Sequence, residues 1–520
     1  MADIFAYNDL PEVLMHPRIR PYALTLSILL LSAAALATTP TVTVASPANN
    51  ATTTSPVNYV ATAVSPDCAE GISTIEIYSA PHVVAYFSVG GSMDAYVNLP
   101  AGTYNTVVEA FDNCGGVGEA DITVTTTGES QIGGFLYTAN TNFIYGDGGR
   151  NAVYGFTIVP SNGALAPTGQ GAVDANEAPQ SIASDKGGYR LYVGDYYSGD
   201  VFAYFIDRDN GYIFPVPGAP FPVNHSVTAV AVHPSGDWVF ATRDENAAGD
   251  GIAVFAVQSN GSLVEAAGSP YSTQPGPYTM VMDPGGQYLY VATTDYPGTN
   301  QYSYVDGFSF SASTGTLTPL PGSPFAFPIP SACSDKSSLT LFQMGMLDDL
   351  GKYLYVGQTD LDYIEGMTID SATGAPTEMK NSPWPDEDGC VQPPDCTDCA
   401  NNPTSLAVDG TGKFLYTLNQ GASNIGIYSI GSGGALTFVK YEEIGQVCYG
   451  TLGTDSTGSY LYAGTCQGIP QVYSGFEAVS GFSINHITGD LTPTPGSPYN
   501  YELSFFPNGL TIVQALTVTP

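Results

Sequence analysis

The sequence contains few basic residues. Lys and Arg together number 12, against 48 Asp and Glu, and the formal net charge is −36. Because this charge repels phosphate backbones and anionic lipid headgroups, nucleic acids and membrane surfaces are unfavourable partners. The five His residues occur without a Cys-x-x-Cys-His haem motif. We therefore expect no bound cofactor.

Charged residues of either sign are also scarce, at 12% of the chain. Disorder is nevertheless excluded, because 43% of the residues are hydrophobic and Tyr alone contributes 35. The 59 Gly and 39 Pro indicate many turns, and the Val, Tyr, Thr and Phe between them favour strands. The composition predicts an all-β protein.

The apolar run Tyr22–Ala37 is too short, at 16 residues, to span a membrane. It follows Arg18 and Arg20 and closes on Ala35-Leu36-Ala37, a pattern typical of a signal-peptide cleavage site. We expect residues 1–37 to be an export signal. The mature protein would then be periplasmic, cell-surface or extracellular, and not membrane-spanning.

The cysteines predict disulfides, because exported proteins fold in an oxidising compartment. Cys68 and Cys114 each follow a strand-like run and form one expected pair. Cys448 and Cys466 flank a hairpin whose turn centres near Thr457, so an antiparallel register places them opposite each other. The other four allow three connectivities, with a four-thiolate zinc site as the alternative: Cys333, Cys390, Cys396 and Cys399.

Residues 38–127 predict a β-sandwich of immunoglobulin type. The segment Leu99–Asp112 resembles bacterial Ig-like modules, and a polar linker, 128–133, follows the sandwich. Short alternating runs recur at Thr41–Ala45, Val57–Val64, Ser73–Tyr78, Val83–Val89, Thr103–Phe111 and Ala120–Thr126.

From residue 134 onward the sequence is periodic. A strand flanked by aromatic residues recurs seven times, and its central residues lie 55, 48, 50, 65, 61 and 46 positions apart. A strand of small residues and an Asp/His-x-x-Gly turn precede several copies, and a third strand and a fourth closing on Gly-Ser-Pro follow. The copies centre on Leu136, Leu191, Val239, Leu289, Leu354, Leu415 and Leu461.

Four strands in roughly 50 residues correspond to one propeller blade. Residues 134–515 therefore predict a seven-bladed β-propeller, with 516–520 as a tail. The first copy lacks its initial strand, whereas the chain ends with an orphan one, Pro507–Val513. We expect this C-terminal strand to complete the first blade and close the ring.

These repeats resemble the lactonase family of seven-bladed propellers, which has 6-phosphogluconolactonase-like or YVTN-type repeats. The resemblance implies a site of His and Arg, with acidic residues, at the mouth of the axial tunnel, and hydrolysis of a lactone. The family's His-Pro-His-like segment before a first strand is not found here; Ala178–Ser181 and Asn402–Ser405 occupy two such positions.

Charged loop residues make up the candidate catalytic site. In a propeller, the loop entering a blade's first strand and the loop between its second and third strands share one face. The first loop of one blade carries His225 and the second carries three charged residues, while the preceding blade adds a carboxylate. The alternative interpretation is a surface ion pair among solvated loop residues. The candidates are His225, Arg243, Asp244, Glu245 and Glu177.

Two functions follow from this pattern. The first is a binding protein, expected to be monomeric, that uses the loop face to hold a small molecule, a glycan or a surface protein. The second is hydrolysis of a neutral sugar lactone. The phosphorylated substrate of the family is disfavoured because it is an anion and the chain is strongly acidic.

Overall fold

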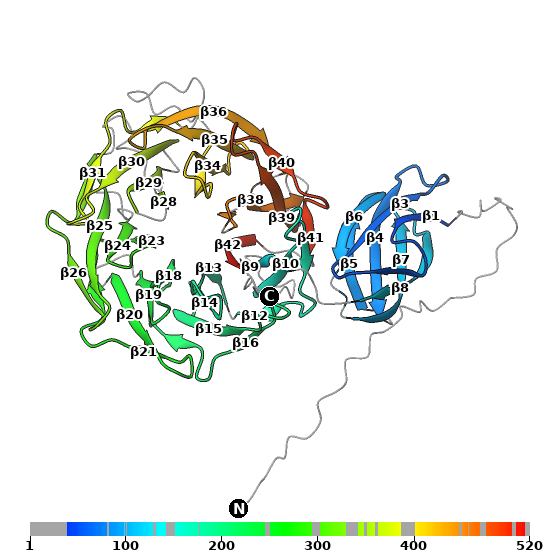
Figure 1. Cartoon of the computed structure of the whole chain (residues 1–520), viewed down its shortest axis with the longest axis horizontal. Helices are drawn as coiled ribbons and strands as arrows, with labels where there is room; N and C mark the ends of the chain where they lie inside the picture. Colours follow the sequence, from blue (N-terminus) through cyan, green and yellow to red (C-terminus); the bar gives the residue numbers. More distant parts are fainter. Residues whose placement is uncertain are drawn as a thin grey trace, which may run out of the picture.

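The computed structural model consists of a ring of β-sheets beside a smaller β-sandwich (Figure 1). Strands are the regular elements of the described residues, so the all-β class is confirmed. None of the described segments forms a helix with the length and apolar character needed to cross a bilayer. The predicted signal peptide, 1–37, lies outside the described residues. The structure describes residues 39–514 except 81–82, 98, 100, 128–131, 142–150, 176, 245–249, 294–301, 329–341, 348–350, 359–361, 386–400, 446, 448–449, 456, 469–474 and 502–505.

Eight strands between residues 41 and 126 form two sheets that share one core. One sheet has the order β1 (Thr41–Ser46), β3 (Val57–Val64), β6 (Ser92–Val97). The other has the order β2 (Ala51–Thr53), β8 (Val117–Thr126), β7 (Gly102–Asp112), β4 (Ile72–Ala80), β5 (Val83–Val89). Alternate residues of these strands, such as Tyr59 and Ile77, are fully buried between the sheets.

The sequence predicted six of these strands and missed β2 and β6. β2 has three residues and pairs in parallel with β8, so it carries too little periodicity to be recognised. β6 alternates correctly, with Met93, Ala95 and Val97 in the core, but Asp94 interrupts its apolar character.

Cys68 and Cys114 form the predicted disulfide, which joins the loops after β3 and β7. Cys466 lies in β38, opposite Glu477 of the neighbouring strand. The pairing of Cys466 with Cys448 remains a prediction, because Cys448 lies outside the described residues. The same holds for Cys333, Cys390, Cys396 and Cys399.

We expect replacement of both Cys68 and Cys114 by Ala to lower the free energy of unfolding of the sandwich by about 4 kcal/mol. The bond spans a sequence separation of 46 residues, and chain-entropy arguments assign that amount to a loop of this length. Thermal unfolding followed by circular dichroism, with the unmodified chain as control, measures the change. Identical midpoints for the two chains would contradict the prediction.

From residue 134 on, the described strands form seven sheets, which are drawn around a central axis in Figure 1. The first three, from axis to rim, are β42 (Phe506–Gln514), β9 (Gly134–Thr141), β10 (Ala152–Ile158), β11 (Leu165–Pro167); β13 (Pro179–Ser184), β14 (Arg190–Asp195), β15 (Asp200–Ile206), β16 (Ile213–Pro215); and β18 (Val230–Val232), β19 (Trp238–Arg243), β20 (Gly251–Val257), β21 (Leu263–Glu265).

The other four are β23 (Pro277–Met282), β24 (Tyr288–Thr293), β25 (Tyr302–Ser311), β26 (Thr316–Pro319); β28 (Phe342–Leu347), β29 (Tyr353–Gln358), β30 (Tyr363–Ile369), β31 (Pro376–Glu378); β33 (Pro403–Val408), β34 (Phe414–Asn419), β35 (Asn424–Ile430), β36 (Leu436–Glu443); and β37 (Leu452–Thr454), β38 (Tyr460–Gly468), β39 (Gly475–Ile484), β40 (Leu491–Pro493). In every sheet the second strand is one of the aromatic strands recognised in the sequence.

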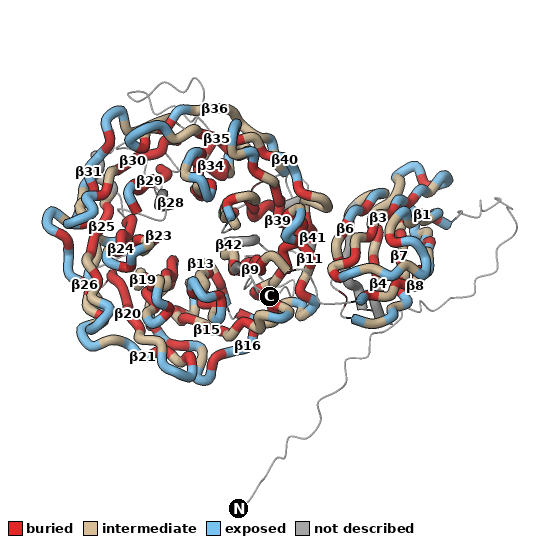
Figure 2. The backbone as a smooth tube through the Cα atoms, in the orientation of Figure 1, coloured by how far each residue is buried: buried red, intermediate tan, exposed pale blue. Residues whose placement is uncertain are grey.

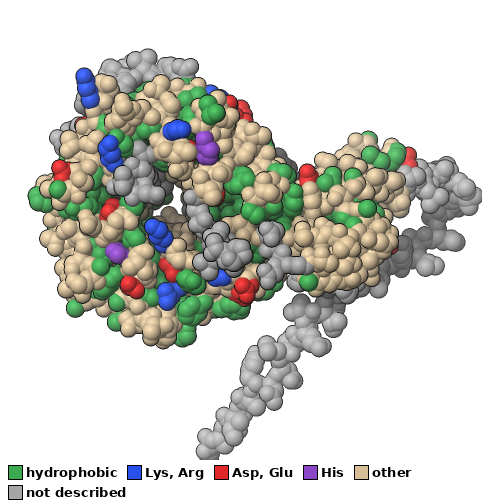
Figure 3. Space-filling model, viewed as in Figure 1, with side chains coloured by type: hydrophobic (Ala, Val, Ile, Leu, Met, Phe, Trp, Pro, Cys, Tyr) green, Lys and Arg blue, Asp and Glu red, His purple; other side chains and the backbone are tan. Residues whose placement is uncertain are grey.

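The first sheet combines the two ends of the ring. β42 pairs antiparallel with β9, with Ile512 opposite Leu136 and Val513 opposite Phe135. This confirms the predicted closure by the C-terminal strand. Figure 2 shows that buried residues follow the inner strands of each sheet, whereas exposed residues gather at the outer edges and turns. The face seen in Figure 3 has an opening at the centre of the ring.

The outer edge of the sheets differs from the prediction of one fourth strand. Two short segments share the outer position in all but the sixth sheet, because a turn, in several sheets Gly-Ser-Pro, interrupts the strand. At this turn the Ser269 hydroxyl accepts a hydrogen bond from Val254 N–H, and Ser323 accepts one from Gly307 N–H, both at 3.0 Å. The second segments are β12 (Val173–Asp174), β17 (Phe221–Pro222), β22 (Tyr271–Ser272), β27 (Phe325–Pro328), β32 (Trp384–Pro385) and β41 (Tyr499–Tyr501).

A tyrosine hydroxyl joins neighbouring sheets at five positions. In each, a buried Tyr of a second strand donates to a glycine carbonyl in the turn between the third and fourth strands of the next sheet. The bond from Tyr462 to Gly163, at 2.8 Å, joins the last sheet to the first. The other pairs are Tyr137 with Gly211, Tyr290 with Gly374, Tyr355 with Gly434, and Tyr416 with Gly489.

The sandwich contacts the ring where the ring closes. The Asn162 side chain, in the turn after β10, donates to the Tyr96 hydroxyl of β6 at 2.9 Å. Tyr96 also packs against the apolar cluster between the first and last sheets.

Candidate functional site

The predicted site residues lie at one end of the second and third sheets. Glu177 precedes β13, and His225 lies in the loop that leads to β18. Arg243 is the last residue of β19, opposite Gly251, and Asp244 follows it. Glu245 lies outside the described residues.

A buried carboxylate, not recognised in the sequence, holds two loops of the second sheet together. Asp195 is fully buried at the end of β14. One of its oxygens accepts the N–H groups of Glu177 and Ala178 at 3.0 and 2.7 Å. The other accepts those of Tyr197 and Ser198 at 3.0 and 2.8 Å. The loop entering the sheet and the loop between its second and third strands are therefore fixed relative to each other.

The loop that carries His225 packs against the loop after β14, at Gly199. Gly199 has a φ of +68°, and a Cβ added there would lie 2.9 Å from backbone atoms of His225. The Gly199 carbonyl accepts the N–H groups of Val223 and Asn224 at 2.9 and 3.0 Å. Only glycine permits both the positive φ and this close approach, so Gly199 positions the His225 backbone.

Asp244 is tied to the same loop by the backbone. Its N–H donates to the Ser226 carbonyl at 3.0 Å, and the two residues form an isolated β-bridge. Tyr196 lies beside them: burial raises the pKa of Tyr196, and the negative charge of Asp244 raises it further. The phenol therefore stays protonated and remains a hydrogen-bond donor.

We call the surface formed by Glu177, Tyr196, Tyr197, His225 and Asp244 the loop-face rim. Tyr197 is 53% exposed, and its ring meets the Tyr196 ring edge to face at a centroid distance of 5.4 Å. Carboxylates, an imidazole and an exposed aromatic ring are the groups that bind a hydroxyl-rich ring compound, through hydrogen bonds and stacking. The structure thus places four of the five predicted residues, Glu177, His225, Arg243 and Asp244, at one end of the second and third sheets.

The described residues contain one cluster of metal-binding residue types close enough to share an ion. It consists of Cys68, Glu70 and Cys114. The disulfide uses both sulfurs of this cluster, so the cluster does not offer the thiolates that metal ligation requires.

Solved structures with the same fold as the ring include lactonase-type proteins. A candidate 6-phosphogluconolactonase of Bacteroides fragilis is 17% identical, with a TM-score of 0.55, over 75% of this chain and 100% of that chain. A second, from Bacteroides uniformis, is 16% identical, with a TM-score of 0.56, over 73% and 99%. The periplasmic gluconolactonase of Pseudomonas aeruginosa is 14% identical, with a TM-score of 0.51, over 71% and 99%.

These similarities define the fold of the ring as a β-propeller of the kind found in 6-phosphogluconolactonase-like proteins. No family model and no curated protein matches the sequence.

Proposed function

We propose that this protein is an exported binding protein that holds a neutral, hydroxyl-rich ring compound of the sugar-lactone class on the loop-face rim. In this proposal residues 1–37 direct export, the sandwich is an Ig-like module, and the seven sheets are lactonase-type blades. The observation that carries the proposal is the Asp195 carboxylate, which fixes Glu177 and Tyr197 beside each other. A site ordered in this way binds without the cost of arranging its loops.

A second function, hydrolysis of the bound lactone, is favoured by the likeness to lactonase-type structures. His225 would accept a proton from water as the water oxygen attacks the lactone carbonyl carbon, and Arg243 would stabilise the oxyanion. Cleavage of the ring acyl–oxygen bond then yields the hydroxy acid. The charge of the chain favours neutral lactones over phosphorylated ones.

Calorimetric titration with gluconolactone, its hydroxy acid and a panel of neutral sugars tests the binding proposal. We expect Tyr197→Ala to weaken binding by roughly tenfold, because it removes the stacking ring. Tyr189→Ala is the matched control, since Tyr189 is 50% exposed at the opposite end of the same sheet. Equal losses in the two variants, or no binding to any member of the panel, would overturn the proposal.

Hydrolysis is tested separately by pH-stat measurement on the same lactones. We expect His225→Ala to abolish turnover above the spontaneous rate while lactone binding persists. Turnover that survives His225→Ala would place the reaction elsewhere. Binding without turnover in the unmodified chain would leave the binding function and reject the hydrolase.

A further inference from the structure

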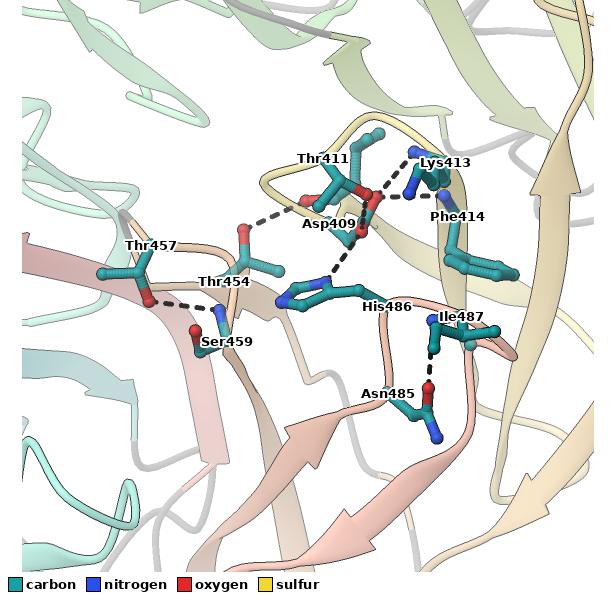
Figure 4. Close-up of polar contacts among 12 residues, drawn as sticks. Asp409, Thr411, Lys413, Phe414, Thr454, Thr457, Ser459, Asn485, His486 and Ile487 are labelled. Carbon is teal, nitrogen blue, oxygen red and sulfur yellow. Dashed lines mark hydrogen bonds and ion pairs between the residues drawn. The ribbon is translucent and has the colours of Figure 1, made fainter.

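A histidine fills the space between the sixth and seventh sheets at the end opposite the rim. His486, in the turn between β39 and β40, places its Nδ1 atom 3.2 Å from Oδ2 of Asp409 (Figure 4). The Asp409 side chain is fully buried, and the imidazole is one-third exposed. The other Asp409 oxygen accepts the N–H groups of Lys413 and Phe414, at 2.8 and 3.0 Å. The imidazole lies between Asp409 and the hydroxyl residues Thr454 and Ser459 of the last sheet.

We call the contact between two neighbouring sheets a seam, and the carboxylate with its turn the carboxylate frame. The seam between the last sheet and the first has a similar carboxylate frame. Asp455 begins an Asp-x-Thr-Gly turn like that of Asp409, and it accepts Tyr460 N–H at 2.7 Å and the Thr457 hydroxyl. Asp409 accepts the Thr411 hydroxyl in the same manner. The two carboxylates therefore share their place in the turn, an N–H contact from the residue five positions on and a hydroxyl contact from the Thr two positions on.

The residue equivalent to His486 is Pro160. In the last sheet, Gly489 N–H donates to the Asn485 carbonyl, and the Gly489 carbonyl accepts the hydroxyl of Tyr416. In the first sheet, Gly163 N–H donates to the Val159 carbonyl, and the Gly163 carbonyl accepts the hydroxyl of Tyr462. His486 follows Asn485 as Pro160 follows Val159. Proline has no side-chain donor for the carboxylate of Asp455.

A cavity lies where the imidazole would be. It has a volume of about 240 Å³ and is lined by Asp455, Thr457, Ser459, Pro160, Gly134 and Ile512, among others. The strand registers show that Ile512 occupies the position that Thr454 has beside His486. Leu461 and Leu136 are the central residues of the aromatic strands of the last and first sheets, and Thr454 lies opposite Leu461 as Ile512 lies opposite Leu136. At the position where Thr454 places a hydroxyl beside His486, the cavity is therefore lined by the apolar side chain of Ile512.

We propose that this cavity binds a protonated nitrogen base the size of imidazole, with an N–H group donated to Asp455 and the ring against Pro160 and Ile512. His486 shows within the same chain how an imidazole contacts this carboxylate frame. The volume is below the ~300–1,000 Å³ of sites for drug-sized ligands, which limits the occupant to about one ring. The charge of −36 attracts cations to the surface.

Titration of the full chain at pH 6 with imidazole, and with the neutral ring pyrazole of the same shape, tests the proposal by ligand-observed NMR. We expect pyrazole to bind roughly tenfold more weakly, because it lacks the charge-assisted hydrogen bond. Asp455→Asn should weaken imidazole binding by a similar factor. Asp409→Asn is the matched change at the seam that His486 already occupies, and it should leave imidazole binding unchanged.

Pro160→His provides a test that does not remove the carboxylate. The new side chain should occupy the cavity and abolish imidazole binding, while Tyr197→Ala on the loop-face rim should have no effect on it. N-acetylhistidine methylamide separates the two sources of the ligand: its binding together with imidazole identifies a histidine side chain, and binding of imidazole alone identifies a free base. Equal affinity for imidazole and pyrazole, or binding unchanged in Pro160→His, would overturn the inference.

Discussion

A chain that ends at residue 505 should lose the cooperative thermal transition of the ring and associate into oligomers. The deletion removes β42, which is the innermost strand of the first sheet and pairs with β9 along its length. Val513, which is buried, and Leu510 and Ile512, which are half-buried, leave the apolar clusters on both sides of that sheet. Each such side chain contributes roughly 1–3 kcal/mol, and the exposed edge of β9 becomes a template for pairing between chains.

The summed loss is comparable with the total stability of a typical domain, about 5–15 kcal/mol. Differential scanning calorimetry and size-exclusion chromatography measure the two effects. A chain that ends after Gln514 is the control, because it retains β42. The sandwich should keep its own transition, since its core contains no residue of β42. A monomeric truncated chain with an unchanged ring transition would contradict the prediction.

Replacement of Glu365 by Gln should make the protein more stable at pH 8 and remove most of its loss of stability between pH 5 and 8. Glu365 lies in β30, is 5% exposed, and its Oε2 atom has no hydrogen-bond partner in the structure. Burial raises its pKa to about 8, and the charge of Glu378 adds to the shift. An unfolded Glu has a pKa of about 4.3.

Between these two pKa values the folded state retains a proton that the unfolded state has lost. The free energy of unfolding therefore falls as the pH rises, by up to about 1.4 kcal/mol per pH unit, or about 4 kcal/mol from pH 5 to 8. Urea unfolding at pH 5, 6.5 and 8 measures the slope. Asp306→Asn is the control: burial raises the pKa of Asp306 to about 6, so its contribution is confined to lower pH. Parallel slopes in Glu365→Gln and the unmodified chain would refute the assignment.

The architecture of the ring could be predicted because its signals are local and repeated. Aromatic residues such as Tyr290 recur with glycine turns every 46 to 65 positions. The first copy lacks one strand and the last segment supplies an extra one, so together they predict that the two ends share a sheet. The outer edge was not recognised because segments such as Tyr271–Ser272 are two residues long and carry no period. They form strands because their backbones pair with the third strand of the sheet, as Tyr271–Ser272 pairs with β20.

The candidate site was predictable in its charged residues but not in what positions them. Asp195 appears in the sequence as one more acidic residue after a strand. Asp195 is buried and accepts four N–H groups because the folded chain places two separate loops around it, and the sequence alone does not show this. The equivalence of Pro160 and His486 is likewise a property of the folded ring, since it depends on a bond between Tyr462 and Gly163, 299 positions apart.

The series of tyrosine hydroxyl bonds is incomplete, and this bears on the motions of the ring. Tyr192 occupies the same position in the second sheet and is fully buried, but its hydroxyl has no hydrogen-bond partner in the structure. Its ring packs in the apolar cluster that joins the second and third sheets. The third sheet carries Phe240 at this position and also lacks the bond. Local opening of a protein follows the distribution of its stabilising contacts, so we expect neighbouring sheets to separate more readily at these two seams than at the five that have the bond. The loops of Glu177 and His225 lie at the other end of the Tyr192 seam, so we expect any opening of that seam to change the distance between the parts of the loop-face rim on the second and third sheets.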